Sequence, residues 1–267
     1  MRYLVSIAAL LLVTFTTTAQ TDSVAVVEPQ PIAAALDNDT LWERGNQAYI
    51  DGDFATAQSY YSAIENSGNY SARLYYNMGN AYFKQNMLGK AILYYNRALV
   101  VAPSMDDARY NLEIAEAQTK DKIAVVPEFF LVRWMRTVRS TMSCSAWSVI
   151  SMVLFGVALS LLLLFLLATA IKVRKCGFYG TIVVLLLFVA TTAFAISDRN
   201  VIVDRQGAIV MSSAIAVKSS PDRSATDLFV LHEGTKVVVS SEIDGWAEIT
   251  IADGKKGWTE SSHLERI

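Results

Sequence analysis

The most informative stretch of the chain reads LYYNMGNAYFK over residues 74–84 and AILYYNRAL over residues 91–99. Its small residues recur at the spacing that lets two antiparallel helices approach closely, and they are Gly79, Ala91 and Ala98. Pro103 follows the second apolar segment and ends it, because proline cannot continue a helix. The stretch therefore predicts a packed pair of helices over residues 72–105.

The same pattern occurs once more, 34 residues earlier in the chain. Equivalent positions hold the same residue types in both units, namely Gly45-Asn46 and Gly79-Asn80, Ala57 and Ala91, and Tyr61 and Tyr95. This period and these residue types resemble the tetratricopeptide repeat, in which each repeat is one helix pair. The first unit is looser, because Ile64 stands where a small residue is expected and Asn69 replaces the proline. A further helix from Asp106 to about Lys120 would cap the second pair, which gives an all-α repeat domain over residues 39–122.

Stacked tetratricopeptide repeats form a concave groove that binds peptides, and the resemblance implies such a groove here. Matching the repeat positions predicts that its lining contains Asn46, Tyr49, Tyr76, Asn77, Asn80, Phe83, Lys84 and Asn111. The asparagine amides would pair with the backbone of an extended ligand. The alternative interpretation is that these residues lie on solvated helix faces, or that each asparagine bonds a neighbouring helix.

The composition predicts a membrane protein with soluble parts. The chain is 53% hydrophobic and 18% charged, whereas soluble domains carry about 25% charged residues. Charge is absent from residues 140–171 and 176–197. Since about 20 apolar residues span a bilayer, we predict transmembrane helices over residues 146–171 and 177–196. The connection, residues 172–176, is so short that the two helices form an antiparallel hairpin. Its cations favour the cytoplasmic side, and they are Lys172, Arg174 and Lys175.

The N-terminus has the pattern of a signal peptide over residues 1–19. Arg2 precedes a short apolar segment, and Thr17-Thr18-Ala19 offers small residues before a cleavage point. An uncleaved anchor and a buried helix are the alternatives. A signal peptide would place both soluble parts in the periplasm of a bacterium, anchored in the inner membrane, with residues 20–38 as a linker.

Residues 123–145 form a lead-in to the first predicted span. Arginines recur at i, i+3 and i+6 with apolar residues between them, at positions Arg133, Arg136 and Arg139. This pattern predicts an amphipathic helix that lies in the headgroup layer. The alternative is that these residues are the frayed start of the first span.

The C-terminal part, residues 204–267, changes to the alternation of a small all-β barrel. Short strands are predicted over residues 208–211, 214–217, 236–239 and 246–251, with tight turns at Asp244-Gly245 and Asp253-Gly254.

The order of motifs in this part, among them residues 216–221, 231–235 and 257–264, resembles a bacterial SH3 domain. Eukaryotic relatives dock proline-rich peptides, but the expected proline and tyrosine are replaced here by Glu260 and His263. We expect Trp246, Glu260 and His263 on the binding surface and Trp258 in the core. The resemblance implies cell-wall peptide as a ligand.

Several functions are disfavoured by the sequence. The net charge is −2, which argues against nucleic-acid binding. Two cysteines and two histidines are too few for a metal centre built from these residues, so we expect no metal and no cofactor. Phosphate-binding and dinucleotide-binding glycine motifs are absent, and no catalytic constellation is evident, so we expect a protein that is not an enzyme.

The order of modules, together with residues 74–84 and 91–99, resembles the BatE family of the Bacteroides aerotolerance operon. The resemblance implies partners that are membrane proteins with von Willebrand A domains and a MoxR-type ATPase, in a complex for envelope stress tolerance. We therefore expect a membrane-anchored scaffold. The alternative is a signal transducer in which a cytoplasmic ATPase senses the loop at Lys172, Arg174 and Lys175 when a periplasmic ligand binds.

Overall fold

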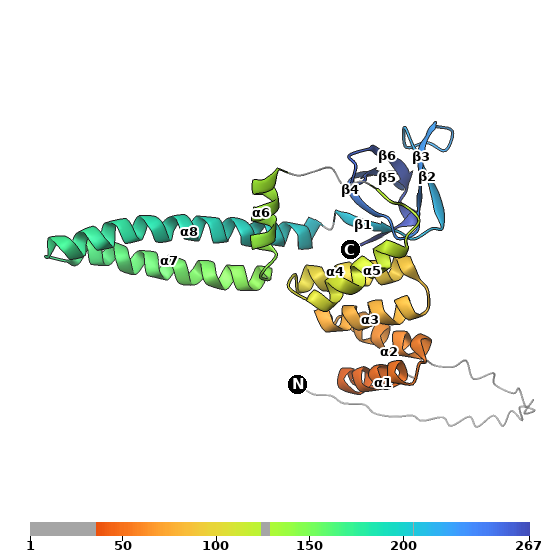
Figure 1. Ribbon diagram of the computed structural model, residues 1–267, viewed down its shortest axis with the longest axis horizontal. Helices are drawn as coiled ribbons and strands as arrows, with labels where there is room; N and C mark the ends of the chain where they lie inside the picture. The colour runs from red at the N-terminus through yellow and green to blue at the C-terminus, as the bar shows by residue number, and fades with distance from the viewer. Residues whose placement is uncertain (1–35, 124–128, 205) are drawn as a thin grey trace, which may run out of the picture.

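The computed structural model describes residues 36–123, 129–204 and 206–267 (Figure 1). The predicted signal peptide and nearly all of the predicted linker, residues 20–38, lie outside these residues. The described chain forms a helical repeat region, a long helical hairpin and an antiparallel β-sheet, which confirms the predicted fold class.

The repeat region consists of five helices with short connections. They are α1 (Asn38–Ile50), α2 (Phe54–Asn66), α3 (Ala72–Lys84), α4 (Leu88–Val101) and α5 (Asp106–Gln118). The first three begin at residues whose side chains accept a hydrogen bond from the backbone three positions on, and these caps are Asp37, Asp53 and Ser71. Helix α4 ends two residues before Pro103, as the sequence predicts.

The 34-residue period has a direct packing explanation. The α-carbon of Gly45 lies against the ring of Tyr61, and a β-carbon there would be 2.6 Å from that ring. Gly79 and Tyr95 repeat this contact, and a β-carbon at Gly79 would likewise lie 2.6 Å from the Tyr95 ring. Each helix pair therefore needs glycine at this position of its first helix to make room for the tyrosine ring of its second helix.

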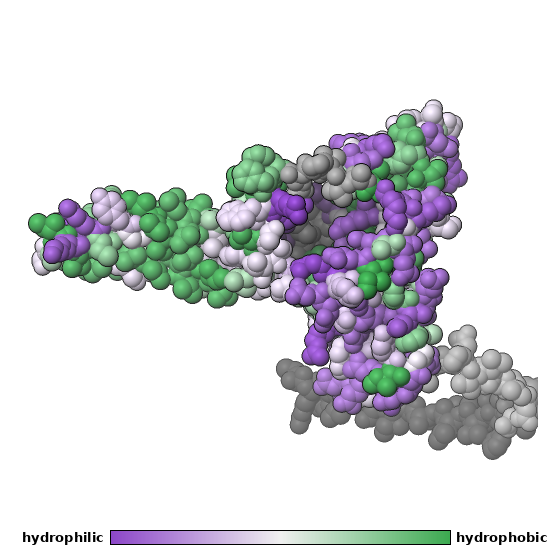
Figure 2. Space-filling model, in the orientation of Figure 1, coloured by the Kyte–Doolittle hydropathy of each residue, from purple (hydrophilic) through white to green (hydrophobic). Residues whose placement is uncertain are grey.

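Helices α7 (Cys144–Leu167) and α8 (Ile171–Asp204) form the hairpin. Both contain a stretch that is long and apolar enough to cross a membrane. Figure 2 shows that the hairpin surface is predominantly hydrophobic, while the rest of the visible molecule is mostly hydrophilic. The predicted loop at residues 172–176 is wrong, because these residues already belong to α8 and the connection is residues 168–170. Long cationic side chains extend to the headgroups from a helix end, so the charges did not require a loop.

The predicted limits of the two spans change accordingly. Helix α7 stops at Leu167 rather than at residue 171, and α8 extends beyond residue 196 to Asp204. The two helices approach closely at Gly177, where a β-carbon would lie 2.8 Å from the backbone nitrogen of Phe165. Glycine at this position therefore allows the tight hairpin.

Helix α6 (Phe130–Arg139) is a separate helix that crosses the hairpin near its soluble end (Figure 1). Ser143 caps the start of α7, so α6 is not the frayed beginning of the first span. Its exposed side chains include Phe130, Trp134 and Met135, alternating with the arginines. The amphipathic pattern is thus realised as an independent helix.

The C-terminal strands are β1 (Gly207–Val210), β2 (Ala214–Lys218), β3 (Asp227–His232), β4 (Lys236–Ile243), β5 (Trp246–Thr250), β6 (Lys256–Glu260) and β7 (Leu264–Arg266). They form one antiparallel sheet in the order β3-β2-β6-β5-β4-β1-β7. Asp244 and Gly245 both have positive φ and join β4 to β5 in the predicted two-residue turn. The sequence analysis did not predict β3 as a strand.

The sheet packs directly on the helical repeats. Ile209 of β1 is fully buried and belongs to the same hydrophobic core as Ile92 and Leu93 of α4. Gly234, with a φ of +86°, lies so close to Ile92 that a β-carbon would be 2.9 Å from its Cδ1 atom. The helical repeats and the sheet therefore form one packed body, which we call the soluble body.

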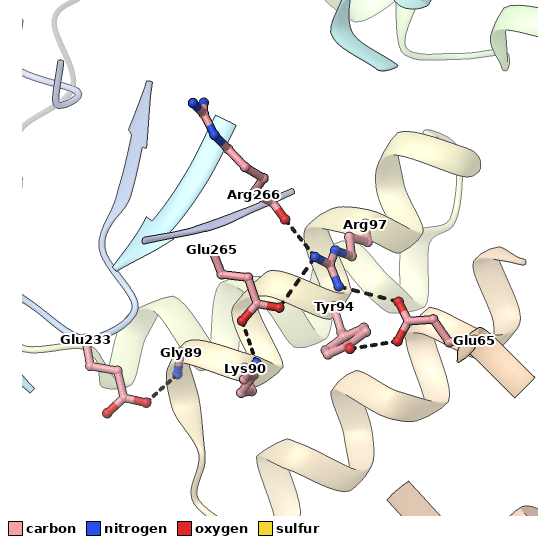
Figure 3. A network of polar contacts seen from close by, with 8 residues as sticks. All are labelled: Glu65, Gly89, Lys90, Tyr94, Arg97, Glu233, Glu265 and Arg266. Carbon is pink, nitrogen blue, oxygen red and sulfur yellow. Dashed lines mark hydrogen bonds and ion pairs between the residues drawn. The ribbon is translucent and has the colours of Figure 1, made fainter. Parts of the chain in front are cut away.

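Polar contacts reinforce this packing (Figure 3). The Lys90 ammonium and the Arg97 guanidinium, both on α4, pair with the carboxylate of Glu265 on β7. Arg97 also donates to the backbone carbonyl of Arg266 at 2.7 Å, and the Gly89 amide donates to the Glu233 carboxylate at 2.9 Å. This polar network occupies the side of α4 that faces the sheet, so the opposite side of the repeats remains accessible.

Candidate functional site

A pocket of about 220 Å³ lies on the concave side of the repeats, away from the sheet. Its lining residues come from α1, α3, α4 and α5, and they are Tyr49, Tyr76, Asn80, Phe83, Lys84, Tyr95, Asn111 and Ile114. Six of these were predicted from repeat positions. Tyr95 and Ile114 were not assigned to the groove, although the 34-residue period had already marked Tyr95 as a packing residue.

Two predicted groove residues, Asn46 and Asn77, do not line this pocket. The Asn46 side-chain oxygen accepts hydrogen bonds from the Tyr61 hydroxyl at 2.9 Å and from the Asn77 amide at 3.1 Å. These bonds join α1 to α2 and α3. The contacts correspond to the alternative interpretation, in which an asparagine bonds a neighbouring helix.

The next repeat reproduces this arrangement at the pocket itself. The Asn80 oxygen accepts from the Tyr95 hydroxyl at 2.8 Å and from the Asn111 amide at 2.9 Å. The Asn111 amide also lies 3.2 Å from the Tyr76 hydroxyl. Asn80 and Asn111 therefore fix the pocket floor and link α3, α4 and α5. Helix α5 thus occupies the position that the first helix of a third repeat would take.

Two tyrosines of the pocket, Tyr49 and Tyr95, have pKa values above that of a free tyrosine. Burial raises the pKa of Tyr49, and the nearby Tyr76 phenol raises it further. Burial likewise raises the pKa of Tyr95 well above its ordinary value. Lys84, in the last turn of α3, is the one cation among the residues that line the pocket and is solvent-exposed. The pocket thus combines aromatic walls, fixed amides and a positive charge at its edge.

The outward face of the sheet carries the predicted SH3-like surface residues. Trp246 of β5 lies opposite Glu260 of β6, and both are partly exposed. The Glu260 carboxylate pairs with the Arg223 guanidinium at 2.9 Å. The prediction that Trp258 lies in the core is wrong, because its neighbours Gly257 and Thr259 point inward and Trp258 itself is only partly buried.

His263 does not stand free on this surface. Its Nδ1 atom lies 2.8 Å from the Ser212 hydroxyl.

His232 makes a contact that the sequence did not predict. Its ring and backbone nitrogens each lie 2.7 Å from the Asp121 carboxylate. Thr235 donates to the same carboxylate at 2.6 Å. Asp121 follows the repeats, so this cluster is a further attachment of the sheet to the helices.

The hairpin cations lie on the first turns of α8. The Arg174 guanidinium lies over the ring of Phe165 on α7, 5.7 Å from its centre. Among the described residues, no group of three or more His, Cys, Asp and Glu side chains is arranged to hold a metal ion.

Comparison with known families identifies both modules. Residues 72–105 match the tetratricopeptide repeat model, and residues 213–265 match the bacterial SH3 domain model. No match to the chain is found among curated proteins. Both matched domains are typically non-catalytic interaction modules, which supports an adaptor that binds proteins or the cell wall.

Proposed function

We propose that this protein is a non-enzymatic adaptor anchored in the bacterial inner membrane, with both soluble parts in the periplasm. The concave pocket would bind an extended segment of a protein partner, and the SH3 surface at Trp246 would bind a second protein or a cell-wall peptide. The BatE resemblance adds partners with von Willebrand A domains and a MoxR-type ATPase, in a complex for aerotolerance or envelope stress.

The observation that carries this proposal is the concave pocket. Its amide and phenol groups are positioned by the helix contacts before any ligand arrives, which lowers the entropic cost of binding. Lys84 at the rim favours a peptide that carries an acidic side chain or a terminal carboxylate. The sheet packs on the other side of α4 and leaves the pocket accessible.

Charge reversal of Lys84 provides the test. Asn80 is unsuitable, because it also holds α4 and α5 in place. We expect Lys84→Glu to lower co-purification of a co-expressed von Willebrand A-domain partner at least about tenfold, because attraction becomes repulsion. The matched control is Arg44→Glu on α1, an exposed residue that does not line the pocket. Equal recovery of the partner with both variants would reject the pocket as the binding site.

A second candidate function is signal transduction to a cytoplasmic ATPase. It is favoured by the contact path between the hairpin and the soluble body, since β1 starts at Gly207, soon after α8 ends, and packs on α4. Replacing Lys172, Arg174 and Lys175 by glutamine should then abolish ATPase recruitment. Unchanged recruitment in a variant shown to be correctly oriented would reject this function.

A further inference from the structure

Helix α6 carries an apolar face that the rest of the described chain does not cover. Its apolar residues recur at the spacing that places them on one side of a helix, and they are Phe130, Leu131, Trp134, Met135 and Val138. Four of these five side chains are exposed, Phe130 by 72% and Trp134 by 60%. The helix buries no residue against the other described parts of the protein. Such a face indicates a contact with something other than water.

The arginine side of α6 faces the soluble body. A cavity of about 860 Å³ lies where the repeats, the sheet and the hairpin meet, and its lining from α6 consists of Arg136, Thr137 and Arg139. None of the five apolar residues is among the described residues that line it. Arg139 pairs with Asp198 at 3.1 Å, and Arg136 also has an interaction partner, so both belong to contacts within the protein. The apolar face of α6 therefore points away from the soluble body.

The hairpin determines the level at which α6 lies. Figure 1 shows that α6 runs across the hairpin near its soluble end rather than along it. The end of α6 is attached to both hairpin helices, because the Trp147 indole donates to the Arg139 carbonyl at 2.9 Å and the Arg139 guanidinium contacts Ser197 and Asp198. If the hairpin spans the bilayer, a helix that crosses it at this level runs along the membrane surface.

A lipid surface fits this face better than a partner protein does. Only residues 140–143 separate α6 from α7, so the apolar face lies next to the apolar surface of the hairpin. Bulky aromatic residues such as Trp134 are enriched where a protein crosses the membrane–water interface. Helix α6 contains no acidic residue, and the exposed Arg133 can extend its stem toward headgroup phosphates.

We propose that α6 lies in the headgroup layer of the bilayer that the hairpin crosses, with its apolar face in the lipid. The membrane surface then meets α8 at Ser197-Asp198, where the first charged residue after Lys175 occurs. Helix α8 itself continues to Asp204. Its residues 199–204 therefore extend about 9 Å beyond the surface, at 1.5 Å per residue. This inference rests on the proposed membrane anchoring.

A fluorescent probe on single cysteines tests the proposal in the full-length protein, reconstituted in vesicles of phosphatidylcholine and phosphatidylglycerol. In a Cys144→Ser, Cys176→Ser background, the dye NBD is attached at Met135→Cys on the apolar face or at Thr137→Cys on the cavity side. We expect a lipid with a shallow spin label to quench the dye at position 135 at least about threefold more than at position 137, because an interfacial helix buries its apolar face by about 5–10 Å. Aqueous iodide should show the opposite preference. Both positions are exposed, so both variants should fold.

Two results with this pair would overturn the proposal. Equal quenching of both positions by iodide would show that the apolar face lies in water. Protection of position 135 from iodide without quenching by the lipid would show that a second copy or another protein segment covers this face.

The level of the membrane surface is tested on α8 itself. Ile196 and Asn200 lie four residues apart on the same side of α8, and both are exposed. We expect the shallow lipid label to quench the dye at Ile196→Cys, and iodide to quench it at Asn200→Cys. Lipid quenching of equal strength at both positions would refute a surface at Asp198.

A third position separates this inference from the proposed function. Leu186 is 66% exposed and lies in the middle of the apolar stretch of α8. A lipid with a spin label deep in its acyl chain should quench the dye at Leu186→Cys. Without this quenching, the membrane anchor would be refuted, and this inference with it. Quenching at Leu186→Cys together with access of iodide to position 135 would refute the placement of α6 alone.

Discussion

Arg97 is the residue whose removal should most loosen the contact between the repeats and the sheet. Its guanidinium donates to the Arg266 carbonyl and lies 3.5 Å from the carboxylates of Glu265 and Glu65. It also lies 5.0 Å from the centre of the Tyr94 ring (Figure 3). The Arg97→Ala change removes all of these contacts and leaves two carboxylates without this partner.

The magnitude follows from the contacts. A hydrogen bond from a charged donor contributes about 1.5–3 kcal/mol. Each partly exposed ion pair adds about 0.2–1 kcal/mol, and these contributions are not additive. We therefore expect Arg97→Ala to weaken docking of the sheet by about 2–4 kcal/mol. This corresponds to a factor of about 30 to 700 in the docking equilibrium, since about 1.4 kcal/mol is tenfold.

Hydrogen exchange at the Gly89 amide measures this equilibrium. Gly89 lies in the first turn of α4, where amides have no partner within the helix, and its hydrogen bond goes to Glu233 of the sheet. Undocking exposes this amide while α4 stays folded. Exchange at Gly89 in the full-length protein should therefore accelerate by the factor given above in Arg97→Ala.

The control is Arg109→Ala, which removes an exposed arginine paired with Asp106 three residues earlier in the chain. Such a pair contributes about 0.3–0.5 kcal/mol, so Gly89 exchange should change at most about twofold. Equal acceleration in both variants would refute the assignment of docking to the Arg97 contacts.

Three further predictions concern stability and orientation. Burial raises the pKa of Asp121, but hydrogen bonds from Thr235 and His232 outweigh burial and hold this pKa below the ordinary value of 3.8. The ionised Asp121 carboxylate therefore contributes fully to stability above pH 3.8, and this contribution is lost as the pH falls below that value. Thermal unfolding between pH 6 and pH 3 should show this loss in the wild type, and Asp121→Asn should flatten it; an unchanged slope would contradict the assignment. Gly79→Ala should lower the free energy of unfolding by about 1–3 kcal/mol in a denaturant titration, because its β-carbon meets an aromatic ring, and a neutral result would contradict the packing account. In a Cys144→Ser background, an impermeant maleimide should label Ser224→Cys in intact spheroplasts but Cys176 only after lysis. The reverse pattern would place the soluble body in the cytoplasm.

Local patterns in the sequence were sufficient to predict the modules. The Gly79–Tyr95 contact requires a glycine and a tyrosine at fixed spacing, so its recurrence 34 residues earlier identifies the repeat. The Asp244-Gly245 turn is equally local, because both residues adopt the positive φ that this turn needs. Features of this kind depend on residues that are close together in the chain, so they can be predicted from the sequence alone.

Features that depend on distant residues could not be predicted. Lys90 and Glu265 are 175 positions apart, and nothing in the sequence around either residue distinguishes it from an ordinary charged surface residue. The loop at residues 172–176 was misplaced for a related reason. Charge marks where a helix leaves hydrocarbon, whereas the chain reversal itself depends on how the backbone turns at residues 168–170.

The order of the elements along the chain gives the docking contact a mechanical consequence. The chain leaves the repeats after α5, runs through the hairpin, and returns at β1, which packs on α4. The hairpin is therefore an insertion whose two ends are held at the same soluble body.

The connections at these two ends are short. Between α8 and β1 there are only residues 205 and 206, and Arg139 before α7 is paired with Asp198 of α8. A change in the packing of α8 against α7 would therefore act on β1 and on its contact with α4. A ligand in the proposed concave site would act on the other side of α4. Helix α4 is thus the element through which binding in the pocket and the packing of the hairpin would be coupled.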